Sequence, residues 1–221
     1  MKTEILYEDE TILVIKKPAG LATQTSKIGE PDVVSELKKY LAECGKKNPY
    51  IGVVHRLDQP VEGLLVFAKN KDAAAGLTKQ FSGGTLNKRY YALVCGKPFA
   101  QEGELVDYLV KEGNLARVVP EGTTEAKKAI LQYKVVKTMP EGLALLDIHI
   151  DTGRFHQIRV QMSHAGMPLL GDTKYGSDAS ISFSREVGVR QVALYAYELE
   201  FKHPITKKAM HYELKPESFR Q

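Results

Sequence analysis

Short apolar runs, each closed by turn residues, constrain the fold of this 221-residue chain more than any other feature of the sequence. The longest runs, such as residues 64–68 and 143–146, fall far short of the roughly 18 residues that a membrane-spanning helix requires. Runs of this length between turn residues are typical of buried strands. The sequence therefore predicts a β-rich globular fold with no segment that crosses a membrane.

Charge, cysteine content and the amino terminus narrow the cellular setting. The 31 Lys and Arg residues exceed the 27 Asp and Glu residues by four, which is a weak indication of nucleic-acid binding because clustering matters more than the sum. The two cysteines, Cys44 and Cys95, lack CxxC spacing, so neither a disulfide framework nor a structural zinc site is predicted. The first residues contain no apolar signal core. We therefore expect a cytoplasmic protein.

The first part of the chain alternates strands and helices. Residues 4–7 and 11–15 are apolar and β-branched around an acidic turn, which predicts a hairpin. Apolar residues then recur at helical spacing after Asp32, which is placed to cap the helix, and Gly45 is placed to end it. Further elements are predicted as a short strand at residues 52–54, a buried strand at 63–68, a helix at 71–81 and a strand at 88–94.

The second part is predicted to be mostly antiparallel sheet. Residues 104–150 contain several β-type runs separated by Glu112-Gly113-Asn114 and Pro140-Glu141-Gly142. A helix is expected at residues 155–166 and a long strand at 192–201. Neither an internal repeat nor a composition shift divides the chain, so one domain spanning residues 1–221 is expected.

Several classes of site are not supported by the motifs present. The phosphate-binding patterns GxxxxGK[ST] and GxGxxG do not occur, and the six histidines form no HExxH pair. His149, His156 and His164 are seven and eight residues apart and cross from a strand into a helix, so packing and surface roles are favoured over metal ligation. An HRD-like kinase loop is also excluded, because a leucine separates Arg56 from Asp58.

Two polar segments remain as candidate chemistry. Asp58 lies in a turn between two apolar strands, and an arginine-rich stretch at residues 153–159 opens a helix. Taken singly, each has an ordinary structural explanation, since an Asp at a strand end is often a turn former and an arginine on a helix is often solvated.

Four ordered motifs resemble one enzyme family. Residues 52–58, GVVHRLD, followed by residues 63–69, GLLVFAK, resemble the catalytic signature of the RluA-type RNA pseudouridine synthases. The resemblance covers nearly the whole chain. Three further segments are similar to that family's amino-terminal strands, tyrosine strand and arginine motif: residues 5–20, 88–96 and 153–176.

The resemblance implies an isomerase that converts uridine to pseudouridine in structured RNA, ribosomal or transfer RNA, without cofactor or metal. We expect a single α+β domain, with a mixed, mainly antiparallel sheet, flanking helices and a central cleft. A monomer is the default expectation for a compact modifier of large RNA. Asp58 matches the catalytic aspartate, Tyr90 the tyrosine that contacts the target base, and Arg159 the basic partner of the aspartate. Further matches with expected RNA contacts are His55, Arg56, Lys88, Arg154, His156 and Gln157.

The chemistry of these residue types agrees with those roles. Burial alone would protonate a carboxylate, whereas a guanidinium about 4 Å away contributes on the order of 4 kcal/mol at an effective dielectric near 20. We therefore expect Asp58 and Arg159 to share one pocket that admits an extruded uracil. An aromatic face can receive that base, with stacking worth about 1–3 kcal/mol. Tyr90 and Tyr91 are adjacent on a strand, so only one of them can face the site.

The chain departs from the family pattern in several ways, and Gln161 and Tyr195 stand where a histidine is common. Val61-Glu62 stands where the family usually carries Thr-Ser, and an acidic side chain near Asp58 could raise the pKa of that carboxyl if both faced one pocket. The chain is also expected to lack the small S4-type RNA-binding domain of many relatives, which would leave RNA binding to the catalytic domain. The basic residues that we expect to serve this role are Lys38, Lys39, Lys46, Lys47, Arg56, Lys88 and Arg89.

Two other functions stay open on the sequence alone. The Val61-Glu62 change motivates a catalytically silent RNA-binding or ribosome-assembly factor on the same fold. A hydrolase that uses Asp58 with a histidine is the second alternative.

Overall fold

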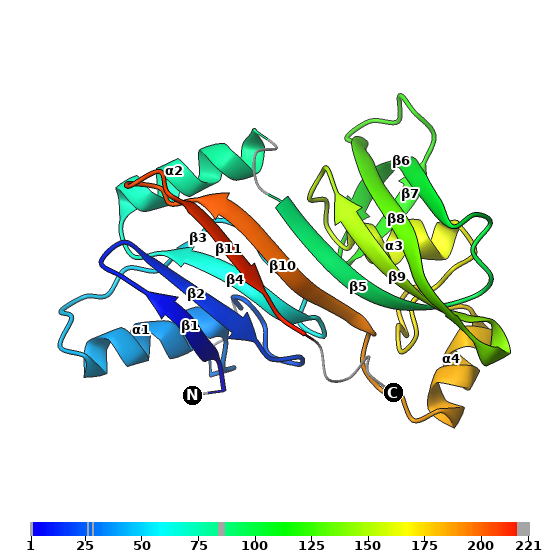
Figure 1. Ribbon diagram of the computed structural model, residues 1–221, viewed down its shortest axis with the longest axis horizontal. Helices are drawn as coiled ribbons and strands as arrows, with labels where there is room; N and C mark the ends of the chain where they lie inside the picture. Colours follow the sequence, from blue (N-terminus) through cyan, green and yellow to red (C-terminus); the bar gives the residue numbers. More distant parts are fainter. Residues whose placement is uncertain (1, 26, 28, 84–86, 216–221) are drawn as a thin grey trace. The chain divides into compact units, whose positions relative to one another are not determined.

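A computed structural model describes residues 2–25, 27, 29–83 and 87–215 of the chain. The chain forms two compact units, whose elements are labelled in Figure 1. Unit 1 comprises residues 1–88 and 196–221, and unit 2 comprises residues 89–195. The single domain expected over residues 1–221 stays a prediction.

Unit 1 is built on an antiparallel hairpin that continues into a larger sheet. The hairpin β1–β2 occurs as predicted, and β2 pairs antiparallel with β4, followed by β10 and β11. The short strand β3 also pairs with β4. The strands are β1 (Glu4–Glu8), β2 (Ile12–Lys17), β3 (Gly52–Val53), β4 (Glu62–Ala68), β10 (Leu194–Lys202) and β11 (Ala209–Glu213).

Both helices of unit 1 begin at the residues that the sequence indicates. Asp32 caps α1 (Val33–Glu43) by accepting a hydrogen bond from the Ser35 backbone N–H at 2.7 Å. Helix α2 (Lys71–Ser82) starts after Asn70, whose side chain accepts from the Ala73 backbone N–H at 2.8 Å. These caps satisfy backbone donors that the first helical turn leaves without partners.

Strands β2 and β4 are buried on both faces in the core of unit 1. Ala73 and Leu77 of α2 pack with residues of one face, Ile12, Val14, Leu64 and Val66. Alternate residues on the other face, Leu13, Ile15, Leu65 and Phe67, are also fully buried. Burying each such side chain contributes about 1.5–3 kcal/mol. The strand ends from which the loops of the candidate site depart are therefore firmly held.

Unit 2 is an antiparallel sheet in the order β5-β9-β8-β6-β7, as the β-type runs predict. Gly113 turns between β6 and β7 with a φ of 58°, and a short 3-10 turn, Pro140–Gly142, joins β8 to β9. The strands are β5 (Asn87–Cys95), β6 (Glu102–Glu112), β7 (Leu115–Val119), β8 (Lys127–Met139) and β9 (Leu143–Ile150).

Two helices complete unit 2. Val160 of α3 (Gln157–His164) packs with Leu109, Ala116 and Ala129 of the sheet. Helix α4 (Asp178–Glu186) was not predicted, because its buried positions are Ser180 and Ser184 and no apolar stripe marks it.

The α+β class with a mainly antiparallel sheet is confirmed, and the central cleft stays a prediction. Strand β11 was also not predicted; its alternation is short, with Met210 and Tyr212 half-buried against the core of unit 1. Among the described residues, no helix is both long and apolar enough to span a membrane.

Replacing Gly63 in β4 should destabilise unit 1 severely. A Cβ there would lie 2.2 Å from the Ala196 carbonyl oxygen, and the glycine has a φ of 134°. We expect Gly63→Ala to lower the free energy of unfolding by about 3 kcal/mol or more, measured by urea unfolding. Gly113→Ala is the matched control, since it has a positive φ but no atom within 4 Å. Equal losses in the two variants would show that the close approach to Ala196 does not matter.

Candidate active site

Asp58 lies where the sequence predicts it, in the loop of residues 54–61 that joins β3 to β4. The carboxylate residue is half-buried, while Leu57 before it and Val61 after it are buried. The Val61 backbone N–H donates to the Asp58 carbonyl oxygen at 3.1 Å, which closes a turn. Two buried apolar side chains and this turn therefore set the position of Asp58 in unit 1.

The segment after β2 binds this loop on both sides of Asp58. The Thr23 hydroxyl donates to the Leu57 carbonyl at 2.8 Å and accepts from the Leu57 N–H at 3.2 Å. The Gly20 N–H donates to the Gln59 carbonyl at 2.8 Å, and the Gln59 side-chain amide donates back to the Gly20 carbonyl at 3.1 Å. The backbone flanking Asp58 is thus fixed by hydrogen bonds to residues 20–23.

Lys17, at the end of β2, is fully buried beneath the same loop. Its ammonium donates to the backbone carbonyls of Leu21 (2.6 Å), Pro18 (2.9 Å) and Gln59 (3.1 Å). Burial lowers the pKa of Lys17 to about 8, and the negative charges of Asp58 and Glu62 oppose that shift. The Lys17 ammonium is therefore electrostatically linked to the Asp58 and Glu62 carboxylates. Lys17 was not among the predicted site residues, because one of two adjacent lysines at the end of a strand is usually solvated.

Glu62, one of the departures from the family pattern, is paired with a cation. Its carboxylate lies 2.9 Å from the Lys16 ammonium, and both side chains are one-third exposed. An exposed pair of this kind contributes about 0–1 kcal/mol. For the site, this pair means that Lys16 compensates the negative charge of Glu62.

His55 is held against β4 rather than directed to solvent. Its Nε2 accepts the Val66 backbone N–H at 3.0 Å, which places the proton of the neutral imidazole on Nδ1. The ring stacks on Phe81 with 4.3 Å between centroids. Burial, and secondarily the charge of Lys88, holds the pKa of His55 well below its usual value. The role of His55 as an RNA contact stays a prediction.

Arg56 and Lys88, two basic residues expected to contact RNA, lie in different environments. Arg56 is exposed, and its Nη2 donates to the Gln24 side-chain oxygen at 2.9 Å. The Lys88 ammonium lies 5.2 Å from the centroid of the Phe81 ring, and burial lowers the pKa of Lys88 to about 8. The Arg56 guanidinium is therefore exposed to solvent. The Lys88 ammonium, in contrast, is partly desolvated and makes a cation–π contact with Phe81.

Arg159 in unit 2 forms a buried, bidentate ion pair with Asp172. Its Nε donates to Asp172 Oδ2 at 2.7 Å and its Nη2 to Oδ1 at 2.8 Å. The side chains are 4% and 1% exposed, so the two buried charges compensate each other. This role of Asp172 was not predicted from the sequence. The expectation that Arg159 also pairs with Asp58 stays a prediction.

Tyr175 joins the Arg159 region to His156. Its hydroxyl lies 2.7 Å from His156 Nδ1 and accepts the Ala116 backbone N–H at 2.8 Å. The Arg159 guanidinium carbon lies 5.1 Å from the centroid of the Tyr175 ring. Contacts from β7 and from the start of α3 therefore converge on one tyrosine.

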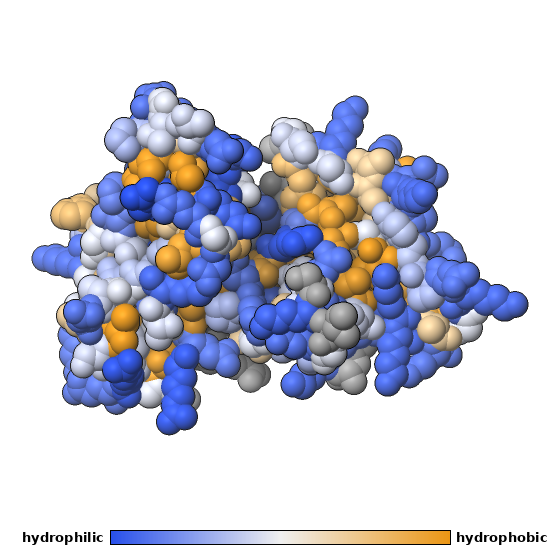
Figure 2. All heavy atoms as spheres, turned by 180° about the vertical axis from the view of Figure 1, so that it is seen from behind, coloured by the Kyte–Doolittle hydropathy of each residue, from blue (hydrophilic) through white to orange (hydrophobic). Residues whose placement is uncertain are grey.

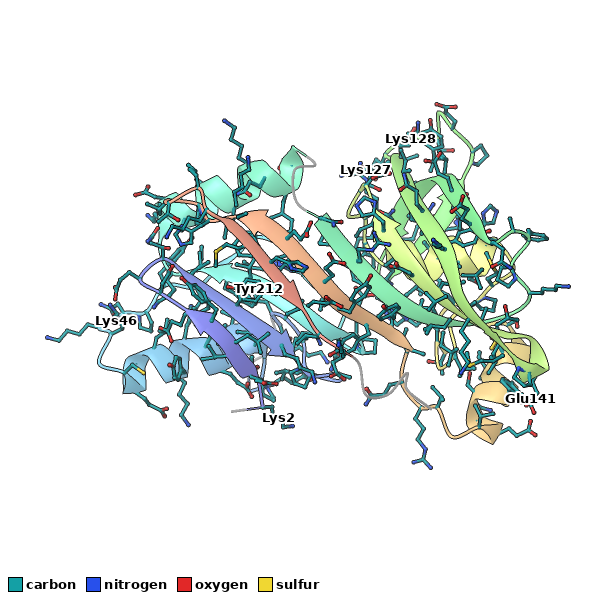
Figure 3. All side chains as sticks on the ribbon, viewed as in Figure 1. Lys2, Lys46, Lys127, Lys128, Glu141 and Tyr212 are labelled. Atoms are coloured by element: carbon teal, nitrogen blue, oxygen red, sulfur yellow. The ribbon has the colours of Figure 1, made fainter. Side chains whose placement is uncertain are left out.

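Gln157 and Arg154 shape the turn that leads into α3. Gln157 is buried, and its side-chain oxygen accepts from the Thr152 hydroxyl at 2.8 Å and from the Arg154 N–H at 2.9 Å. The exposed Arg154 side chain donates from Nε to the Lys128 carbonyl at 2.9 Å. Figure 3 labels Lys127 and Lys128 at one end of β8. Whether Gln157 and Arg154 contact RNA stays a prediction.

Tyr90 and Arg89 lie in β5. Tyr90 is 5% exposed and shares a buried face with Ala92 and Val94, while Tyr91 on the opposite face is half-buried. Arg89 donates from Nε to Asp147 Oδ1 at 3.2 Å on the neighbouring strand. The role of Tyr90 toward a target base stays a prediction.

Other polar groups lie at the surface. The part of the surface seen in Figure 2 is largely hydrophilic, with apolar patches between. Two of the lysines expected to bind RNA have acidic neighbours, with Lys46 3.3 Å from Glu10 and Lys39 3.9 Å from Glu43. Within the described residues, potential metal ligands gather at Glu198, Glu200 and His211, whose ligand atoms lie within 4.8 Å of one another. That group is mostly exposed, and acidic surface groups of this kind are common without a metal.

The shifted pKa of Lys17 predicts how stability changes with pH. Between pH 8 and 10.5 the unfolded chain binds more protons at this lysine than the folded chain does, so its burial penalty falls as pH rises. We expect the free energy of unfolding of the wild type to increase, relative to Lys17→Met, between pH 8 and 10. Lys88 is present in both proteins, so its contribution cancels. Lys38→Met, which removes an exposed lysine of α1, gives the baseline, and a pH-independent difference for Lys17→Met would refute the prediction.

Removing Asp172 should leave a buried guanidinium without its bidentate partner. We expect Asp172→Asn to lower the free energy of unfolding by about 3 kcal/mol, measured by urea unfolding. Glu112→Gln is the control, because it removes the acid of the exposed pair with Arg117 and should cost less than about 1 kcal/mol. Similar losses in the two variants would contradict the inferred dependence of Arg159 on Asp172.

Comparison with known proteins gives one consistent answer. The family profile described as RNA pseudouridylate synthase matches residues 11–164. The chain is 34% identical to the ribosomal large subunit pseudouridine synthase D of Zymomonas mobilis, over 95% of this chain and 68% of that protein. It is 29% identical to the tRNA pseudouridine synthase C of Vibrio cholerae, over 94% of this chain and 88% of that protein.

A solved structure shares the fold. The human RNA pseudouridylate synthase domain containing 4 has a TM-score of 0.78 and 24% identity, over 98% of this chain and 90% of that chain. The ribosomal large subunit pseudouridine synthases C of three Rickettsia species are longer proteins. This chain spans 58–59% of the length of each of them. The family profile and the 34% identity establish that this chain belongs to the RNA pseudouridylate synthase family.

Proposed function

We propose that this protein is an RNA pseudouridine synthase, with Asp58 as its catalytic carboxylate. The observation that carries the proposal is the immobilised Asp58 loop in a chain of this family: residues on both sides of Asp58 are hydrogen-bonded to residues 17–23. A carboxylate that must meet a ribose carbon needs a fixed position before the substrate arrives.

The reaction is an isomerisation, so its atoms balance within the nucleotide. The bond from ribose C1′ to uracil N1 breaks, the base turns, and a bond from C1′ to C5 forms. The hydrogen on C5 leaves as a proton and N1 gains one. Asp58 would either attack the nucleotide or act at C1′ and C2′ as the glycosidic bond breaks. Neither route needs an oxidant or a reductant.

We assign the remaining site residues as the resemblance implies. Tyr90 would contact the displaced uracil, and Arg159 would act as the cationic partner of Asp58. Because Asp172 already compensates Arg159, this assignment requires the guanidinium to serve two carboxylates. Arginine has five N–H donors, so it can hold Asp172 and still offer a donor to a second acceptor.

We propose RNA as the partner, with large-subunit ribosomal RNA favoured over transfer RNA, and a cytoplasmic monomer as the acting form. Relatives named for each RNA class match this chain, and the ribosomal ones include the 34% identical protein. Mapping pseudouridines in a deletion strain against its parent would identify the modified site. Loss of a site in transfer RNA, with ribosomal RNA unchanged, would overturn the preference for ribosomal RNA.

Asp58→Asn tests the enzyme directly, because it keeps the side-chain shape and removes the charge. We expect the wild type to convert uridine in bulk cellular RNA and Asp58→Asn to convert none, with RNA affinity within a few-fold of the wild type. Conversion would be measured by nucleoside analysis and affinity by filter binding. Asp178→Asn is the control, since it changes an exposed carboxylate in the first turn of α4.

Each other outcome favours a different function. Equal conversion by the wild type and Asp58→Asn would eliminate the proposed role of Asp58. RNA binding without conversion by the wild type would favour the silent RNA-binding factor. Activity that requires added metal and disappears with a chelator would favour the hydrolase.

A further inference from the structure

Tyr175 contacts two expected site residues of unit 2, His156 and Arg159, and the backbone of β7. Besides its contacts with His156, Arg159 and Ala116, its backbone N–H donates to Asp172 Oδ1 at 3.2 Å. Its carbonyl oxygen accepts from the Ser163 hydroxyl of α3. The position of the phenol is therefore set independently of His156.

The hydrogen bonds at the Tyr175 hydroxyl indicate where its proton lies. The Ala116 backbone N–H can only donate, so it occupies a lone pair of the hydroxyl oxygen. His156 Nδ1 lies 2.7 Å from the same oxygen, a distance at which it can accept the hydroxyl proton. A neutral imidazole whose Nδ1 accepts must carry its own proton on Nε2.

The backbone conformation and ring contacts of His156 fix the orientation of its imidazole. His156 is the residue before α3, with a φ of 53° and a ψ of 26°, and its side chain makes no capping hydrogen bond. A left-handed conformation costs a non-glycine residue of order 1 kcal/mol or more. The imidazole stacks on Phe155 with 3.8 Å between centroids and meets the Tyr175 ring edge-on at 5.5 Å. The ring is thus held on one face by Phe155 and at Nδ1 by Tyr175.

We propose that Tyr175 is a positioning residue that fixes His156 in the tautomer with its proton on Nε2, so that His156 acts toward RNA as a hydrogen-bond donor. The part that concerns RNA rests on the proposed function, whereas the tautomer does not. Tyr175 acts through His156 and needs no contact with the substrate. The Arg159 contact, made by the ring rather than the hydroxyl, survives when only the hydroxyl is removed.

Nitrogen-15 spectroscopy of the full chain tests the tautomer without any substrate. Long-range proton–nitrogen correlations of a neutral imidazole distinguish the two tautomers, and His156→Gln identifies the signals of this residue. We expect the Nε2-protonated tautomer in the wild type and a mixture in Tyr175→Phe. Tyr108→Phe is the control, because it removes the hydroxyl of another tyrosine in the same unit, one that bonds to Glu121. An Nδ1-protonated wild type, or an unchanged tautomer in Tyr175→Phe, would overturn the proposal.

A double-mutant cycle tests whether Tyr175 acts through His156 on RNA. We expect Tyr175→Phe to weaken binding of bulk cellular RNA about fivefold, as the loss of one hydrogen bond implies, while Tyr108→Phe leaves it unchanged. In a His156→Ala background, Tyr175→Phe should cause no further loss. Additive losses would overturn the proposal. A wild type that binds RNA but converts no uridine would refute the proposed function alone, since the spectra would still decide the tautomer.

Discussion

The buried ammonium of Lys17 links the charge of unit 1 to the geometry of its candidate site. A lysine with no exposed surface loses its hydration, and hydrogen-bond acceptors must replace the lost water. Here they are three backbone carbonyls, one of which belongs to Gln59, the residue after Asp58. Moving the Asp58 loop would remove an acceptor from a buried charge. The buried charge of Lys17 therefore adds to the hydrogen bonds from residues 20–23 that hold the loop.

Unit 2 also contains a buried cation, the guanidinium of Arg159, which is compensated by a carboxylate. Arg159 is buried with Asp172 in a bidentate ion pair, and Asp172 also accepts the backbone N–H groups of Lys174 and Tyr175. A carboxylate with this many donors is held firmly, so it orients the guanidinium as well as neutralising it. Because a guanidinium cannot lose its proton, Arg159 keeps its charge at any pH where the fold persists.

The sequence predicted elements wherever local patterning and burial agreed. The β1–β2 hairpin, the Asp32 cap and the apolar strand β4 all carry strong local signals, and all were found. Helix α4 was missed because serines fill its buried positions. The motif containing Asp58 could be located, but the ammonium beneath it could not, since a lysine at a strand end is usually solvated. Likewise, the partnership of Arg159 with Asp172 depends on a loop that returns 13 residues later, which no periodicity reports.

Val61 and Glu62, which depart from the family pattern, are both accommodated by the local structure. Val61 is 1% exposed, so its side chain helps to anchor the loop rather than to line an open surface. The carboxylate of Glu62 lies 2.9 Å from the ammonium of Lys16, which offsets its charge. The acid was a concern only as an uncompensated charge near Asp58. With a lysine beside Glu62 and the ammonium of Lys17 attracting both carboxylates, the change gives no electrostatic reason to expect a silent protein.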